Sequence, residues 1–200
     1  CVCANAATFT AGSENATAGN VVSVPITVAP SAGETSTDVN AYAIAISYDS
    51  SVLTPVVKGT DEVGDNTYAT VGDSFNSGVL TADLKDNETG NDEVLIGWAA
   101  ASPVNVTEAS TLATVDFTVN ANATGSTDVK VAVAQVANSD SALADKSTIE
   151  AASGTVTVDT ATKVVYGDVD ANGAIEAKDV TLVSKYVAGL TIFTDTQIKA

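Results

Sequence analysis

The chain has 200 residues, of which 25 are acidic and 8 basic, so its formal net charge is −17. It has no histidine and no arginine. These absences exclude Ser-His-Asp and Cys-His catalytic pairs, imidazole zinc sites and bidentate arginine clamps on phosphate or carboxylate groups. The negative charge argues against nucleic acid as a partner, because its binding needs clustered lysine or arginine. No run of apolar residues is long enough for a membrane span.

The first six residues are typical of the end of a secretory signal peptide. Small residues lead to Ala4-Asn5-Ala6, an A-x-A cleavage pattern. The chain has no methionine, which indicates that Cys1 does not begin the translation product. We therefore expect residues 1–6 to be a signal-peptide remnant and the protein to be secreted, in an extracellular or cell-surface complex. Two alternatives stay open: Cys1 could carry a lipid, or Cys1 and Cys3 could form a redox pair.

Residues 7–159 alternate between apolar and polar side chains in short runs separated by Gly, Asn, Asp and Ser. Such period-two runs with frequent turns predict an antiparallel β-sandwich. The predicted strands are 7–11, 20–29, 40–48, 52–58, 67–71, 78–84, 93–99, 111–119, 127–136 and 153–158.

After a linker at residues 160–165, the pattern becomes helical. Val180, Val183, Val187 and Leu190 recur at helical spacing, and Gly189 stands where a helix C-cap is expected. The charge also divides here. Residues 1–160 carry 4 Lys and 20 acids, a net charge of −16, whereas residues 161–200 carry 4 Lys and 5 acids, a net charge of −1.

Residues 168–179 match a twelve-residue calcium loop. Gly173 stands at position 6, where such a loop turns sharply, and Ile175 at position 8 is expected to point into a core. Asp179 departs from the EF-hand pattern, which has Glu at position 12. The pattern predicts a Ca²⁺ site with oxygen ligands from Asp168, Asp170, Asn172, the Ala174 carbonyl, Glu176 and Asp179. The alternative is an acidic turn in which Asp179 caps the helix.

The stretch from Gly167 to Gly189 closely resembles the first repeat of a dockerin module. Dockerin loops have Asp at position 12, so the resemblance accounts for Asp179. It implies that residues 166–200 are a truncated dockerin, since the second repeat would follow Phe193–Ala200. It also implies that the residues choosing a cohesin partner are Ala177, Lys178, Ser184 and Lys185. A lone repeat has little core, so we expect residues 161–200 to be poorly packed.

Residues 7–159 in turn resemble a cohesin. The most specific part is Ser47-Tyr48-Asp49 followed by Val52-Leu53. The resemblance implies a nine-stranded jelly-roll sandwich, followed here by a calcium loop–helix that is half a dockerin. It also implies that one sheet face binds dockerins. The candidate contacts are the outward residues of two strands: Ala41, Ala43, Ala45, Lys130, Ala132 and Ala134. The alternative is that these small residues only fill a solvated face.

The function that these resemblances imply is that of a non-catalytic adaptor scaffoldin. It would bind dockerin-bearing enzymes or subunits and dock to the cohesin of another scaffoldin, in a complex that degrades polysaccharide. Two other functions remain as alternatives. A carbohydrate-binding sandwich would need exposed aromatic residues such as Tyr68 or Phe75, whereas Trp98 shares its parity with core residues. An acidic hydrolase would need paired carboxylates such as Asp83 and Asp116.

Overall fold

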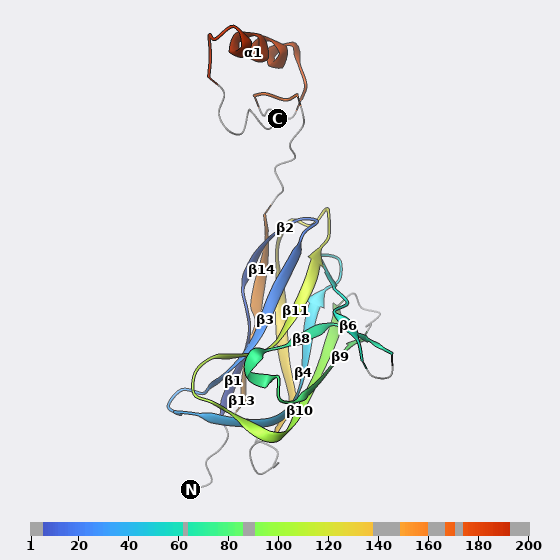
Figure 1. Ribbon diagram of the computed structural model, residues 1–200, viewed down its shortest axis with the longest axis vertical. Helices are drawn as coiled ribbons and strands as arrows, with labels where there is room; N and C mark the ends of the chain where they lie inside the picture. The colour runs from blue at the N-terminus through green and yellow to red at the C-terminus, as the bar shows by residue number, and fades with distance from the viewer. Residues whose placement is uncertain are drawn as a thin grey trace. The chain divides into compact units, whose positions relative to one another are not determined.

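The computed structural model describes residues 6–61, 64–85, 91–137, 149–159, 167–170 and 174–192. The chain divides into two compact units, residues 1–160 and 161–200. The first unit is a sandwich of β-strands and the second holds the helix α1 (Figure 1). The prediction of a mainly β chain is confirmed. The predicted signal-peptide remnant at residues 1–6 and the predicted linker at residues 160–165 fall almost wholly outside the described residues.

Two six-stranded sheets form the sandwich. The first sheet has the order β13-β1-β3-β11-β5, with β8 also paired to β11. Its strands are β1 (Ala7–Ala11), β3 (Val21–Pro30), β5 (Leu53–Pro55), β8 (Ala69–Val71), β11 (Ser110–Val119) and β13 (Ile149–Ala152).

The second sheet has the order β2-β14-β12-β4-β10-β9. Its strands are β2 (Glu14–Thr17), β4 (Thr37–Asp49), β9 (Val79–Lys85), β10 (Asn91–Val106), β12 (Gly125–Ala137) and β14 (Gly154–Asp159). A two-stranded ribbon of β6 (Gly59–Thr60) and β7 (Asn66–Thr67) and the 3-10 helix η1 (Asp73–Phe75) complete the unit. These short pieces make the described strands more numerous than nine, so that count is not confirmed.

The core lies between the two sheets and follows the period-two pattern of the sequence. Along β4, Tyr42, Ile44, Ile46 and Tyr48 are buried, and the residues between them face outward. The ring of Tyr48 meets that of Phe117 on β11, with ring centroids 5.0 Å apart, so the two sheets pack directly against each other. Alternating burial therefore leaves one outer face on each sheet.

The chain changes sheets at two places that lie against each other. β1 leads into β2 through Gly12 and Ser13, and β13 leads into β14 through Ser153. β1 pairs in parallel with β13 in the first sheet, and β2 pairs in parallel with β14 in the second. Thr155 N donates a hydrogen bond of 3.1 Å to Ser13 Oγ at this crossing. The two crossings thus close the same edge of the sandwich (Figure 1).

In the second unit, α1 spans Ala177–Val187. Gly189 has a φ of +72°, its N–H donates to Tyr186 O at 2.9 Å, and Leu190 N donates to Lys185 O at 2.8 Å. This pair of bonds is a Schellman motif, so the predicted glycine cap is confirmed. No helix among the described residues has the length and hydropathy to cross a membrane.

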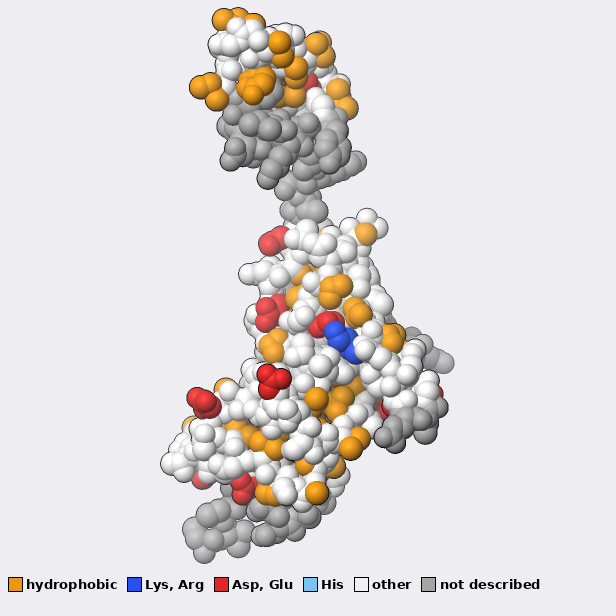
Figure 2. Space-filling view, viewed as in Figure 1, with side chains coloured by type: hydrophobic (Ala, Val, Ile, Leu, Met, Phe, Trp, Pro, Cys, Tyr) orange, Lys and Arg blue, Asp and Glu red, His pale blue; other side chains and the backbone are white. Residues whose placement is uncertain are grey.

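The apolar side of α1 is largely open to solvent within its unit. Val187 is 79% and Leu190 77% exposed, and Ile175, expected in a core, is 64% exposed. Figure 2 shows hydrophobic side chains over much of the described surface of this unit. Its buried described residues are Asp168, Val169 and Asp179. The expectation for Ile175 was therefore wrong, and the expected weak packing of this unit agrees with the exposure.

Candidate functional site

The outer face of the second sheet gathers small side chains on the neighbouring strands β12, β4 and β10, and β9 lies beside them. The register aligns them in rows that run across the sheet. One row is Ala132, Ala45, Leu95 and Asp83; the next is Gln135, Ala43, Gly97 and Thr81; the third is Ala137, Ala41, Ala99 and Val79. We call these twelve residues the small-residue face. The predicted Ala41, Ala43, Ala45 and Ala132 all belong to it.

A β-bulge changes the predicted pattern on β12. The register shifts between Val133 and Gln135, so Ala134 is the extra residue and Gln135 takes the place opposite Ala43. If β12 alternated regularly from Lys130 onward, Ala134 would stand opposite Ala43. Ala134 is exposed, as the candidate contact requires, but it stands outside the ladder and Gln135 takes its place in the row. The outward residues of β10 were not proposed from the sequence, although their parity opposite Val94, Ile96 and Trp98 would have found them.

A polar row borders the small-residue face. Lys130, Ser47, Glu93 and Lys85 lie side by side across the four strands. Lys85 Nζ pairs with Glu93 Oε2 at 3.1 Å, and Ser47 Oγ donates to Glu93 Oε1 at 3.4 Å. These contacts hold Glu93 in place from two sides. The predicted Lys130 stands in this row, at the edge of the small-residue face.

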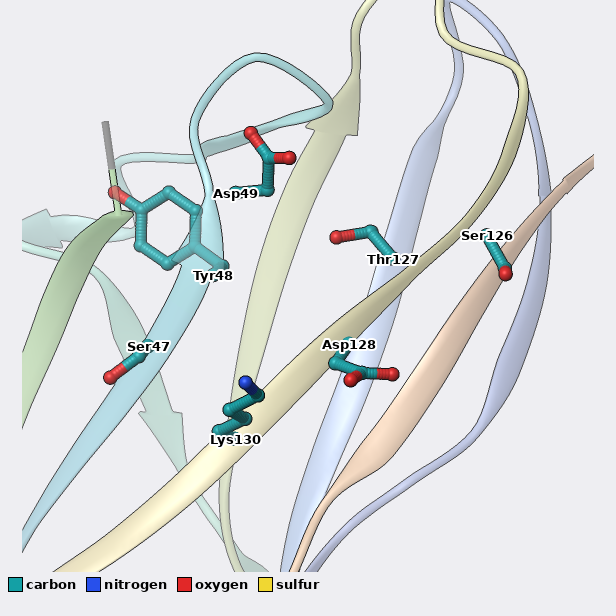
Figure 3. A pocket seen from close by; sticks show the side chains of 7 residues that line it. All are labelled: Ser47, Tyr48, Asp49, Ser126, Thr127, Asp128 and Lys130. Atoms are coloured by element: carbon teal, nitrogen blue, oxygen red, sulfur yellow. The ribbon is translucent and has the colours of Figure 1, made fainter. Parts of the chain in front are cut away.

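A pocket of about 450 Å³ opens beside the polar row. Its lining residues, drawn in Figure 3, come from β4 and β12: Ser47, Tyr48, Asp49, Ser126, Thr127, Asp128 and Lys130. Asp49 Oδ1 accepts hydrogen bonds from Ser51 N at 2.9 Å and Ser51 Oγ at 2.6 Å, which fixes its carboxylate at the strand end. The pocket combines hydroxyls with charges of both signs, so it suits a polar side chain of a partner.

In the second unit, the structure brings Asp168, Asp170 and Asp179 together. One carboxylate oxygen of each lies within 4.8 Å of the others. Calcium takes six to eight oxygen ligands at about 2.3–2.6 Å, so oxygens around one ion lie at such separations. These three residues therefore fit a calcium ion. Asn172, another predicted ligand, lies outside the described residues.

Asp179 also organises the loop through backbone hydrogen bonds. Its Oδ1 accepts from Val169 N at 2.7 Å and Asp170 N at 3.2 Å, and its Oδ2 accepts from Glu176 N at 2.7 Å. The donor at Glu176 is the main reason why the pKa of Asp179 lies below its usual range, against the effects of burial and of the Asp170 charge. The capping alternative and the ligand prediction are thus compatible, because one carboxylate can do both.

Glu176, another predicted ligand, takes part in the cap of α1. It is the N-cap of α1, and its side chain accepts from the backbone N–H of Asp179 in a capping box. Its carboxylate is not part of the three-residue cluster. The carbonyl of Ala174 belongs to the same short segment before α1.

The four predicted partner-choosing residues lie on α1. Ala177 is its first residue, and Lys178, Ser184 and Lys185 follow on its surface. Ser184 Oγ donates to Val180 O at 2.8 Å, so part of its polar capacity is used within the helix. The Lys178 ammonium forms an ion pair with Asp170, which raises the pKa of Lys178.

The structure also places the residues named for the two alternative functions. Phe75 is fully buried and Trp98 is 3% exposed, so neither can stack on a sugar; the placement of Trp98 in the core is confirmed. Tyr68 is half-buried and packs against the core. Asp83 and Asp116 face outward from different sheets, and Asp116 pairs with Lys58 at 2.5 Å. These two carboxylates therefore cannot act on one bond.

Comparison with known proteins identifies the sandwich. Residues 7–158 match the family model of the cohesin domain. The seventh ScaB type I cohesin of Pseudobacteroides cellulosolvens is 18% identical, with a TM-score of 0.55 over 80% of this chain and 96% of that one. A chain of the cohesin–dockerin complex Coh-OlpA–Doc918 of Clostridium thermocellum is 12% identical, with a TM-score of 0.57 over 77% of this chain and 99% of that one. A non-cellulosomal cohesin of the archaeon Archaeoglobus fulgidus is 15% identical, with a TM-score of 0.50 over 77% of this chain and 91% of that one. No curated protein matches the chain.

Proposed function

Because the chain belongs to the cohesin domain family, whose members are protein-interaction modules, we propose that it is a non-catalytic adaptor that binds a dockerin through the small-residue face. The observation that carries the proposal is the register of that face, which places Ala132, Ala45 and Leu95 in one row and Ala43 beside Gly97 in the next. Small side chains let the backbone of a partner helix come close to a sheet. The alternative, a face that only meets solvent, does not require neighbouring strands to align alanine and glycine at Ala132, Ala45, Ala43 and Gly97.

The charge of the sandwich supports the same proposal. Its net charge of −16 favours a partner surface that carries lysine or arginine around an apolar centre. The apolar centre of the small-residue face is Ala43, Ala45 and Leu95, and Asp83 stands at one end of the row of Ala45 and Leu95. The polar row beside it carries Lys130, Glu93 and Lys85, so the negative charge that would steer a basic partner belongs to the sandwich as a whole.

The proposal extends to the second unit, which we assign as the first repeat of a dockerin that holds Ca²⁺. Its support is the cluster of Asp168, Asp170 and Asp179, at positions 1, 3 and 12 of the loop. Asn172 and the Ala174 carbonyl would complete the site, and the carboxylate of Glu176 would lie further from the ion than the three aspartates. Calcium would stabilise the folded loop by binding it in preference to the unfolded one. The exposed Ala177, Lys178, Ser184 and Lys185 would then contact the cohesin of another scaffoldin.

Two binding surfaces on one chain make the protein a link between other proteins. We propose that it works outside the cell, as the signal-like pattern of residues 1–6 indicates, in a secreted or cell-surface complex that degrades polysaccharide. Its partners there would be dockerin-bearing enzymes or subunits on one side and another scaffoldin on the other.

Replacing Ala43 with arginine should weaken dockerin binding at least about a hundredfold, because a long charged side chain at the centre of an interface holds the two backbones apart. The measurement is isothermal titration calorimetry of the full chain against a panel of purified dockerin modules. Thr70→Arg is the matched control, since Thr70 is exposed on β8 in the other sheet. Failure of every dockerin to bind the unmodified chain, or equal binding by Ala43→Arg, would contradict the proposal.

Calcium binding is tested by Asp179→Asn in the full chain. Asparagine removes a charge from the site, and its Nδ2 cannot accept the hydrogen bond from Glu176 N, so we expect Ca²⁺ affinity to fall by roughly a hundredfold. Glu176→Gln is the control. It keeps a capping side chain at the same place, and the affinity should fall only severalfold. A larger loss for Glu176→Gln than for Asp179→Asn would reverse the assigned roles.

A further inference from the structure

Lys178 carries a positive charge at a place in α1 where a helix disfavours one. It is the second residue of the helix, in the first turn, where the helix dipole favours acidic side chains. Its ammonium group nevertheless lies against Asp170 Oδ2, an oxygen that is itself buried. The neighbouring carboxylates must therefore supply the attraction that holds Lys178 there.

The three clustered carboxylates explain this attraction. Asp168, Asp170 and Asp179 bring oxygens within 4.8 Å of one another, and like charges at that distance repel. A cation beside them relieves the repulsion. Lys178 is a cation that the chain itself provides, and Glu176 and Asp179 also attract it. Calcium would relieve the same repulsion with twice the charge.

We propose that Lys178 is an internal counter-ion of the carboxylate cluster, and that calcium displaces it toward the partner. The inference rests on the calcium site of the proposed function and adds a regulation to it. Without calcium, Lys178 stays on Asp170 and steadies the loop. With calcium bound, the positive ion repels the ammonium group, and Lys178 turns to the exposed side of α1. Calcium thus controls whether a partner-choosing side chain is available for docking.

The proposal predicts an unusual effect of removing a charge next to a metal site. Lys178→Gln in the full chain should bind Ca²⁺ about three- to tenfold more tightly than the unmodified chain, because calcium no longer competes with the ammonium group. Lys185→Gln is the matched control: it removes the same charge from the last turn of the same helix. Its effect should be less than about twofold, since that charge is further away and screened. The measurement is calorimetric titration with calcium chloride at low ionic strength.

A second measurement follows the side chain itself. In a chain labelled at lysine, the NMR signals of the Lys178 side-chain methylene groups should shift as calcium is added, with the same midpoint as the calorimetric titration. The signals of Lys185 should stay in place.

The outcomes separate the inference from the function on which it rests. If the unmodified chain binds no calcium, the proposed calcium site is wrong. If it binds calcium while Lys178→Gln binds no more tightly than Lys185→Gln, the site stands and the counter-ion role is overturned. Lys178 signals that do not respond to calcium would likewise overturn the displacement.

Discussion

Replacing Trp98 with alanine should lower the free energy of unfolding of the sandwich by about 3–5 kcal/mol. Trp98 lies on β10 and is 3% exposed. Its ring stacks on Tyr42 with centroids 5.5 Å apart and meets Phe75 edge-on at 5.1 Å. Its Nε1 donates a hydrogen bond of 2.8 Å to Phe75 O. Alanine would leave a cavity among these aromatic rings and a buried carbonyl that has lost this donor.

The measurement is urea unfolding followed by far-UV circular dichroism, because Trp98 is the single tryptophan and its fluorescence disappears in the variant. Trp98→Phe separates the two contributions. Phenylalanine keeps most of the ring volume but cannot donate to Phe75 O, so its loss should be about half that of the alanine variant. A loss below about 1 kcal/mol for Trp98→Ala would show that the aromatic cluster does not hold the sheets together.

The strands that alternate clearly could be predicted from the sequence, and the short edge strands could not. The predicted strand 7–11 coincides with β1, and 111–119 differs from β11 by one residue. β2 and β13 were missed because segments such as Glu14–Thr17 are too short to show a period, and only their parallel partners hold them in a sheet. β10 runs beyond the predicted 93–99 because Pro103 falls at a bulge between Ala99 and Val104, where a strand tolerates proline.

Some residues of the candidate sites could likewise be predicted from the sequence, and others could not. Loop spacing found Asp168, Asp170 and Asp179 because a calcium loop determines its own geometry over twelve residues. The spacing did not predict that the carboxylate of Glu176 takes part in the cap of α1 and lies outside the three-residue cluster. On the sandwich, the alternation of apolar and small side chains along β4 predicted its outward alanines. The neighbours of these alanines, such as Gly97 and Gln135, depend on the pairing of strands far apart in the chain, and the bulge on β12 decides which of them lines up.

The exposed apolar side of α1 shows a further limit of sequence patterns. Val180, Val183, Val187 and Leu190 have helical spacing, and all four are exposed in the described unit. A period tells which side of a helix is apolar, but not what covers that side. The same spacing could therefore not distinguish a core stripe from a surface left open.

Replacing Gly154 with alanine should destabilise the sandwich by at least about 2 kcal/mol, because the added carbon has no space. An ideal Cβ at Gly154 would lie 2.0 Å from Gly12 O and 2.6 Å from Ala11 O. Both atoms are backbone carbonyl oxygens, so no side chain can swing aside. They belong to the crossing from β1 to β2, where Thr155 N also bonds Ser13 Oγ. Relieving the overlap would separate the two sheet crossings and weaken the parallel pairs on both sides.

Thermal and urea unfolding of Gly154→Ala, followed by the fluorescence of Trp98, measure this effect. Gly59→Ala is the control, because the nearest atom to a Cβ there is Thr67 Oγ1 at 3.9 Å, an ordinary contact distance. That variant should keep the stability of the unmodified chain or gain slightly, since alanine restricts the unfolded chain more than glycine does. If Gly154→Ala unfolds at the same temperature and urea concentration as Gly59→Ala, the two crossings have room to move apart, and the stability of the sandwich does not depend on their contact.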